Sequence, residues 1–270
     1  MPDDAPPSLL VSREGPVLEL TMNRPERRNA LSLDMIGRLA DAWDLAETDD
    51  SVRCVILTGT APSYCVGGDM SSGWMAAGYQ AQSDAEQRVI DDPSRIGRGL
   101  LLTSWLTKPI VAAVNGDCLG GGCEMLQQTD IRVAEEHVRF GVPEATRGLI
   151  AGAGSTMRLK RQIPYAIAME MLLTGRLLSA AEALQWGLVN WVVPTGGSLA
   201  RARELAAVVC AAAPLSVQHS KASAIETGWL AEEEARPIEG RHSGLVTRSN
   251  DAKEGMRAFI EKRPPEFTGT

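Results

Sequence analysis

Short, continuously apolar runs bounded by turn residues recur along the first two-thirds of the chain. Two such runs lie at 54–57 and 110–114, and the segments 131–134 and 138–140, each with one arginine, add two more strands. Strands that are apolar at every position are typical of a parallel sheet covered on both faces. Glycine-containing turns and segments of helical periodicity follow them. The order strand, turn, helix therefore predicts a wound α/β core that extends to about residue 190.

The amino-terminal part predicts one further strand and a capped helix. Residues 1–8 are acidic and proline-rich, so we expect them to be disordered and not a signal peptide. A strand is expected over 15–22. Ser32 is expected to cap a helix whose apolar positions share one face, namely Leu33, Ile36, Leu39, Ala40 and Trp43.

From Tyr165 onwards helical signals dominate, and the segment 71–104 has no sustained period. A capping box begins at Ser179, and Gly187 marks a helix end. Helices are also expected from Ser198, near Ser216, from Leu230 and over 250–262. We therefore divide the chain into a disordered start (1–8), an α/β core (9–195) and a helical region (196–270) that covers the core or joins subunits. The segment 71–104 is expected to be mostly surface loop.

Composition narrows the function classes. The 270 residues suffice for one large domain or two small ones, and 44% apolar with 23% charged residues is ordinary for a globular enzyme. A formal net charge of -7 argues against a general nucleic-acid binder. An anionic ligand would need a local basic cluster, and two are present, at Arg24, Arg27 and Arg28 and at Lys262–Arg263.

The cysteine, histidine and hydropathy patterns bear on the compartment, on metal binding and on membrane contact, respectively. The five cysteines contain no CxxC pair and several lie in apolar runs, which predicts buried reduced thiols and a cytoplasmic location. The three histidines, His137, His219 and His242, show no ligand spacing, so no metal is expected. The longest aliphatic stretch, 205–213, is too short for a bilayer, so no membrane contact is expected.

Two glycine turns are the strongest chemical signal. The run 120–122 follows the apolar strand 110–114, and the turn 64–70 follows the strand 54–57. Glycine allows a ligand to approach the backbone closely, and free amides at a helix start favour developing negative charge. A packing turn explains either run alone. Two turns from adjacent strands can instead aim two N–H groups at one carbonyl oxygen.

Two glutamates lie beside these turns. Glu124 follows the glycines of 120–122, and Glu144 follows a proline after the apolar strand 138–140. Either alone is explained as a solvated residue in the first turn of a helix. Together, beside oxyanion-like turns, they favour proton transfer. Other catalytic signatures fail, because 152–157 lacks the last glycine of a dinucleotide fingerprint and neither a phosphate loop nor a G-x-S-x-G elbow is present.

Four segments resemble the signature blocks of the crotonase (enoyl-CoA hydratase/isomerase) superfamily. They are 23–31, 64–70, 115–124 and 140–144, and the stretch 254–263 resembles the end of the hydratases in that family. The resemblance extends from about residue 10 to 268, and so many motifs in this order are highly specific. It implies a spiral of β-β-α units over 9–195, with 196–270 as a trimerisation region in a homotrimer or a dimer of trimers.

The resemblance also implies a ligand and a set of site residues. The ligand is an acyl-CoA thioester, and coenzyme A is part of this substrate, so no separate cofactor is expected. The amides of Val66 and Gly121 would form an oxyanion hole, with Glu124 and Glu144 as the acid/base pair. Residues implied to contact the substrate or coenzyme A are Arg28, Ala30, Gly67, Gly68, Asp69, Met70, Gly152, Phe259 and Lys262, the last two from a neighbouring subunit.

Several residues depart from the family pattern near the expected site. Ala151 stands where a proline is frequent, Ser155 replaces a usual glycine, and Gln127 and Gln128 are more polar than usual. Thr146–Arg147 lies close to Glu144. The catalytic set is intact, so we expect hydration of a 2-enoyl-CoA to a 3-hydroxyacyl-CoA. The alternatives are double-bond isomerisation or another acyl-CoA reaction of this superfamily, and non-catalytic acyl-CoA binding.

Overall fold

The computed structural model describes residues 6–74, 76 and 78–270. Of the segment 1–8 that was expected to be disordered, residues 1–5 lie outside the described residues. Ser8, at its end, is buried, and its hydroxyl donates a hydrogen bond to Asp34 Oδ2 at 2.5 Å. The contact fixes the start of the first strand against the first helix.

The larger sheet has six strands in the order β1-β2-β3-β5-β7-β10, and its strands run parallel except for the edge strand β1. The apolar runs 54–57, 110–114 and 131–134 are confirmed as its central strands. β1 was not predicted, because its side chains are mostly exposed and show no apolar pattern. The strands are β1 (Leu9–Glu14), β2 (Val17–Met22), β3 (Cys54–Gly59), β5 (Ile110–Val114), β7 (Ile131–Glu135) and β10 (Trp191–Val193).

A smaller sheet of four short strands has the order β4-β6-β8-β9. The chain enters it three times directly after leaving the larger sheet, as β3–β4, β5–β6 and β7–β8. This repetition confirms the predicted spiral of β-β-α units. The strands are β4 (Ser63–Cys65), β6 (Asp117–Leu119), β8 (Arg139–Gly141) and β9 (Leu178–Ser179), of which β9 is antiparallel to β8.

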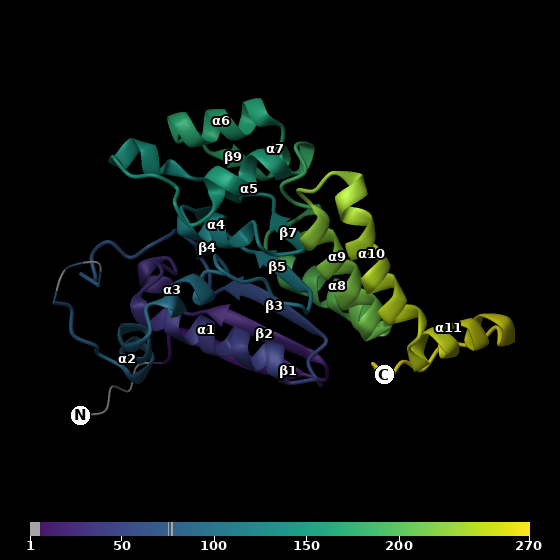
Figure 1. The fold of residues 1–270 in the computed structure, drawn as a ribbon. Helices are drawn as coiled ribbons and strands as arrows, with labels where there is room; N and C mark the ends of the chain where they lie inside the picture. Colours follow the sequence, from purple (N-terminus) through teal and green to yellow (C-terminus); the bar gives the residue numbers. More distant parts are fainter. Residues whose placement is uncertain (1–5, 75, 77) are drawn as a thin grey trace.

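Helices cover both faces of the larger sheet (Figure 1). Val55 and Leu57 of β3 face the core under α1 (Leu33–Thr48), whereas Cys54 and Ile56 face α8 (Ser198–Ala211). The predicted cap of α1 is confirmed, since Ser32 Oγ accepts from the Met35 amide at 3.2 Å. Burial on both faces explains why these strands are continuously apolar.

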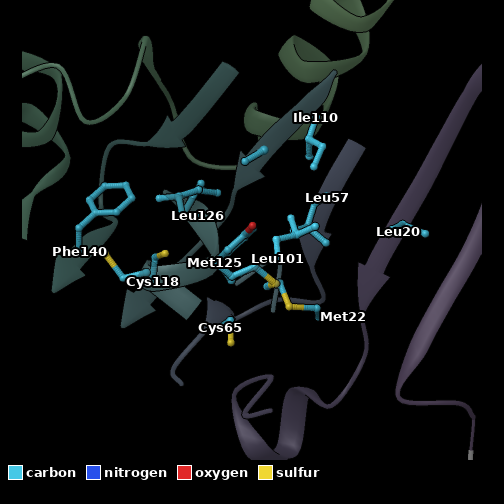
Figure 2. Close-up of a cluster of buried hydrophobic side chains, with 14 of the residues drawn as sticks. Leu20, Met22, Leu57, Cys65, Leu101, Ile110, Cys118, Met125, Leu126 and Phe140 are labelled. Carbon is cyan, nitrogen blue, oxygen red and sulfur yellow. The ribbon is translucent and has the colours of Figure 1, made fainter. Parts of the chain in front are cut away.

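One hydrophobic core joins the two sheets (Figure 2). Met22 and Leu57 of the larger sheet and Cys118 and Phe140 of the smaller one are fully buried, with Met125 of α4 (Gly121–Leu126) packed among them. Each of the five cysteines is a free thiol, as predicted, and only Cys210 is partly exposed. Burial raises the pKa of the Cys65 thiol to about 12. The core therefore packs α4 against the smaller sheet, next to buried side chains of the larger one.

The remaining helices agree in part with the sequence. The capping box at Ser179 and the helices predicted from 198 onwards are confirmed. The segment 71–104 is less irregular than expected, because Ser83 caps a helix there. The helices are α2 (Asp84–Asp91), α3 (Ser94–Gly99), α5 (Ser155–Gln162), α6 (Tyr165–Thr174), α7 (Ala180–Gln185), α9 (Pro214–Thr227), α10 (Glu232–Thr247) and α11 (Asn250–Glu261), with 3-10 turns η1 (Pro25–Arg27) and η2 (Pro143–Arg147).

The last helix, α11, projects away from the α/β core (Figure 1). The chain after it folds back, since the Thr270 carbonyl accepts from the Asn250 amide at 2.7 Å and Asp251 Oδ1 accepts from the Thr268 amide at 2.7 Å. Across the described part of the chain, every helix is too short or too polar to traverse a bilayer.

Candidate active site

The two glycine turns predicted from the sequence lie against each other. Gly67 has φ +95° and Gly120 has φ +53°, a region of backbone conformation that side chains with a Cβ rarely adopt. A Cβ placed on Gly67 would lie 3.1 Å from the amide nitrogen of Gly121 and 3.4 Å from Cα of Gly120. The turns after β4 and β6 are therefore packed backbone to backbone, and only glycine allows this approach.

Two N–H groups at this junction lack an obvious protein acceptor. Among the described residues, the Val66 amide donates to no backbone acceptor. Gly121 is the first residue of α4, where helical hydrogen bonding leaves the amide free. The start of the helix also carries a partial positive charge. These two groups can stabilise negative charge on a ligand oxygen.

The glycine turn after β4 is held in place on one side by hydrogen bonds and ion pairs. Leu31 donates its amide to the Gly67 carbonyl at 2.8 Å, and the Asp69 amide donates to the Leu31 carbonyl at 3.0 Å. The Asp69 carboxylate pairs with Arg24 at 2.9 Å and Arg27 at 3.2 Å. Burial alone would raise the pKa of Asp69, but hydrogen bonds from Ser71 and Arg24 outweigh it and lower the pKa to about 2.

Asp69 was predicted to contact the substrate. Its carboxylate is 4% exposed and is engaged by Arg24, Arg27 and Ser71. The side chain therefore stabilises the turn, and contact of Asp69 with the substrate stays a prediction.

Glu124 lies in the first turn of α4 and is almost completely buried, at 3% exposed. Its Oε1 accepts from the Ser155 amide at 3.1 Å. Burial raises its pKa to about 7, with a smaller contribution from the nearby carboxylate of Glu144, while hydrogen bonds from Ser155 and Ala153 oppose the increase. A carboxyl group with this pKa can both give and take a proton near neutrality.

Glu144 is the second residue of η2, after β8. A Cβ on Gly120 would lie 3.0 Å from its Oε1, so this carboxylate lies beside the second glycine turn. Its Oε2 is buried and has no hydrogen-bond partner among the described residues. Burial raises the pKa of Glu144, and Arg147 partly opposes this increase. A buried oxygen without a partner is suited to hold a ligand or a water molecule.

The structure brings together part of the predicted ligand-binding set. Gly67 and the exposed Gly68 line the junction, and Met70 follows at 62% exposed. Arg28 and the buried Ala30 follow η1, next to the clamp formed by Leu31 and Asp69, and the Arg28 guanidinium pairs with Asp117 at 2.7 Å.

Of the other predicted ligand-binding residues, Gly152 precedes Ala153, which hydrogen-bonds to Glu124, whereas Phe259 and Lys262 are remote from the site. Gly152 is exposed in the loop between η2 and α5. Phe259, at 86% exposed, and Lys262 are on and after α11, which lies far from α4 in the same chain (Figure 1). Within one chain these two residues do not reach the site.

Some residues that contact Glu124 were not assigned a role from the sequence. Ser155 donates its amide to Glu124, and Gln127 Nε2 donates to Ser155 Oγ at 2.6 Å. The positive charge of Arg158 is close enough to interact with Glu124. The only sequence signal for Ser155 and Gln127 was that both are unusually polar for their positions.

A spiral of β-β-α units that places one buried and one partly buried carboxyl group beside paired glycine turns defines a crotonase-fold enzyme. The comparison with known families agrees, because the enoyl-CoA hydratase/isomerase family model matches residues 12–270. The chain belongs to this family, and it is an enzyme of the hydratase type.

Relatives match over nearly their whole length. Enoyl-CoA hydratase EchA19 of Mycobacterium tuberculosis is 46% identical over 261 residues, which cover 97% of this chain and 96% of that protein. The 2,3-dehydroadipyl-CoA hydratase of Escherichia coli is 35% identical, over 97% and 98% of the two chains. A solved enoyl-CoA hydratase from Mycobacterium tuberculosis H37Rv superposes with a TM-score of 0.87 at 36% identity, over 98% of this chain and 100% of that one.

Proposed function

We propose that this protein adds water across the α,β double bond of a 2-enoyl-CoA to give a 3-hydroxyacyl-CoA. The observation that carries the proposal is the pair Glu124 and Glu144, one buried and one partly buried carboxyl group, both with raised pKa values, beside the junction of the glycine turns. Names of the relatives, which include hydratases of several acyl-CoA thioesters, support the same reaction class.

The thioester carbonyl oxygen would accept hydrogen bonds from the amides of Val66 and Gly121. Negative charge moves onto this oxygen when water attacks the β-carbon, so donors fixed at the junction stabilise the enolate-like transition state. Each such donor is typically worth about a hundredfold to a thousandfold in rate. The packing of Gly67 on Gly121 prevents the two donors from moving apart.

The proton balance requires one ionised and one protonated glutamate. The ionised carboxylate takes a proton from the attacking water, whose oxygen bonds to the β-carbon. The protonated carboxyl group gives its proton to the α-carbon as the enolate collapses. The site ends with one proton on the pair, as it began. Burial and mutual repulsion make this singly protonated state favourable near neutral pH.

Coenzyme A would lie along the glycine turn that follows β4. We propose that Arg28, Ala30, Gly68 and Met70 contact it from one chain, while Gly152 borders the acyl group. Coenzyme A is part of the substrate, so the reaction needs no additional cofactor.

Phe259 and Lys262 would reach the adenine end from a neighbouring subunit. The support is the exposure of apolar residues on α11, where Met256 is 62%, Phe259 86% and Ile260 78% exposed. A projecting helix with this apolar surface fits a homotrimer, or a dimer of trimers, in which a second copy covers it. The free thiols fit a cytoplasmic location.

The test is a panel of 2-enoyl-CoA thioesters of different chain length and terminal group, followed by loss of the conjugated absorbance and identification of the product. A 3-hydroxyacyl-CoA product supports hydration. A shifted double bond without added water would indicate the isomerase, and saturable binding without turnover would indicate an acyl-CoA binding protein.

A further inference from the structure

We propose that Ser155 and Gln127 act as positioning residues that hold the Glu124 carboxylate and stabilise its ionised form. This inference deepens the proposed function and rests on it for its catalytic meaning. The contacts themselves join two helices: Glu124 lies within α4 and Gln127 is its C-cap, while Ser155 is the first residue of α5.

The orientation of the Gln127 amide is fixed by its surroundings. Its Nε2 lies 3.1 Å from the Cys123 carbonyl oxygen and 2.6 Å from Ser155 Oγ. A carbonyl oxygen can only accept, so the NH₂ group and not Oε1 must face Cys123. The second hydrogen of the same NH₂ group then points to Ser155. Gln162 Nε2 donates to the Gln127 carbonyl at 2.7 Å and anchors the backbone at this position.

This orientation determines where the Ser155 proton goes. Because Ser155 Oγ accepts from Gln127, its own O–H is free to donate to another group. The acceptor within its reach is Glu124, whose Oε1 accepts from the Ser155 amide at 3.1 Å and whose pKa the Ser155 side chain lowers. The geometry thus allows Ser155 to supply two donors to Glu124. Hydrogen bonds to the charged form of a carboxyl group favour ionisation.

The pair is fully enclosed, which gives the contact its strength. Ser155 is 0% and Gln127 2% exposed, so water cannot replace either donor. Gln127 Oε1 is buried and has no partner among the described residues. An unsatisfied amide oxygen is unfavourable for stability. The hydrogen bond that Gln127 Nε2 donates to Ser155 explains why this glutamine lies in the core despite its unsatisfied oxygen.

The direct test is the titration of Glu124 in the ligand-free protein by ¹³C NMR of labelled glutamate carboxyl groups, assigned with Glu124→Gln. Ser155→Ala removes the hydroxyl and keeps the amide, so the pKa of Glu124 should rise by about one unit. Ser155→Gly should give the same shift, which guards against a folding defect in one variant. An unchanged titration in both variants would overturn the proposal.

Gln127→Met tests whether Gln127 acts through Ser155. It should raise the pKa of Glu124 by less than Ser155→Ala does, and the double variant should match Ser155→Ala alone. Shifts that simply add would show that Gln127 acts independently and would contradict the relay. Gln128→Met is the matched control, since Gln128 donates to the Leu101 carbonyl at 2.7 Å and not to Ser155. It should leave the titration of Glu124 unchanged.

Turnover provides the second readout. In Ser155→Ala, the apparent pKa of Glu124 in the pH dependence of kcat/KM should rise by the shift seen in NMR. KM should change little. A fall in kcat without movement of either limb would indicate a merely structural role and sink the proposal. NMR needs no turnover, so a shifted titration in a protein without hydratase activity would refute the proposed function and leave the positioning role intact.

Discussion

Gly67 and Gly121 are in backbone contact, so close that a Cβ on Gly67 would meet the Gly121 amide nitrogen at 3.1 Å. The two residues belong to successive β-β-α units and are separated by more than fifty positions in sequence. Their contact places the amides of Val66 and Gly121 next to each other as a pair of hydrogen-bond donors. The position of the second turn also brings Glu144 to the same junction, since its Oε1 lies beside Gly120.

Gly121→Pro should abolish the second donor without unfolding α4. Gly121 is the first residue of the helix, where proline is well tolerated because the missing N–H has no helical partner. We expect kcat to fall about a hundredfold to a thousandfold. Gly121→Ala is the control, because it keeps the N–H and its Cβ would be nearest to the end of the Leu31 side chain, at 3.2 Å, with backbone atoms no closer than 3.8 Å. A folded proline variant with near-normal turnover would refute the oxyanion hole, and Val66→Ala should be mild.

Glu124→Gln and Glu144→Gln should each lose hydration about a hundredfold to ten-thousandfold while still binding the thioester. Glutamine keeps the shape of the side chain but cannot exchange its proton. The double variant should lose less than the product of the single losses, because the two groups act as a unit. Turnover and calorimetric binding measure the two effects. If one substitution is harmless and the product is a shifted double bond, the enzyme is an isomerase.

Glu124 should make the stability of the protein fall as pH rises. Burial raises its native pKa from the ordinary 4.5 to about 7, so between these values the native state binds more protons than the unfolded state. The ionised form is disfavoured by up to about 3 kcal/mol above pH 7. Urea unfolding should therefore show Glu124→Gln stabilised by about 1–3 kcal/mol at pH 8 and nearly unchanged near pH 4.5.

The exposed Glu136→Gln serves as the control for this experiment and should change stability by less than about 0.5 kcal/mol at either pH. An equal effect of Glu124→Gln at pH 4.5 and pH 8 would show that the carboxyl group is not destabilised by burial.

Phe259→Ala and Lys262→Ala should weaken coenzyme A binding and raise KM, with little effect on kcat, if α11 reaches a neighbouring site. The neighbouring Lys253→Ala, on the same helix, is the matched control. Light scattering should give a trimer or a multiple of it at micromolar concentration. A monomer with unchanged KM in both variants would contradict the role of α11.

The sequence predicted the parts of the fold that depend on local pattern. The strands β3, β5 and β7 could be predicted because both of their faces are buried. The helix α1 could be predicted because Ser32 caps it. β4 overlaps the predicted turn 64–70, and no strand was predicted at β6. Each is three residues long, which is too short to show a period. Their pairing depends on contacts between successive units.

Long-range contacts, at the candidate site and elsewhere, could also not be predicted from the sequence. Gln127 and Ser155 are 28 positions apart, and nothing local indicates that their side chains meet. His219 and His242 appeared scattered, yet their Nδ1 atoms lie 2.9 Å apart between α9 and α10. The ion pairs of Asp69 with Arg24 and Arg27 form across more than forty positions, so the sequence did not indicate them.

The division of the site among successive β-β-α units has a consequence for engineering. Val66 lies on the first unit, Gly121 and Glu124 on the second, and Glu144 on the third, whereas the connection over 71–104 carries none of these groups. The connection still contributes Ala85, Val89 and Leu101 to the core, so these buried positions must be kept. Its exposed positions can be varied without redesign of the chemistry.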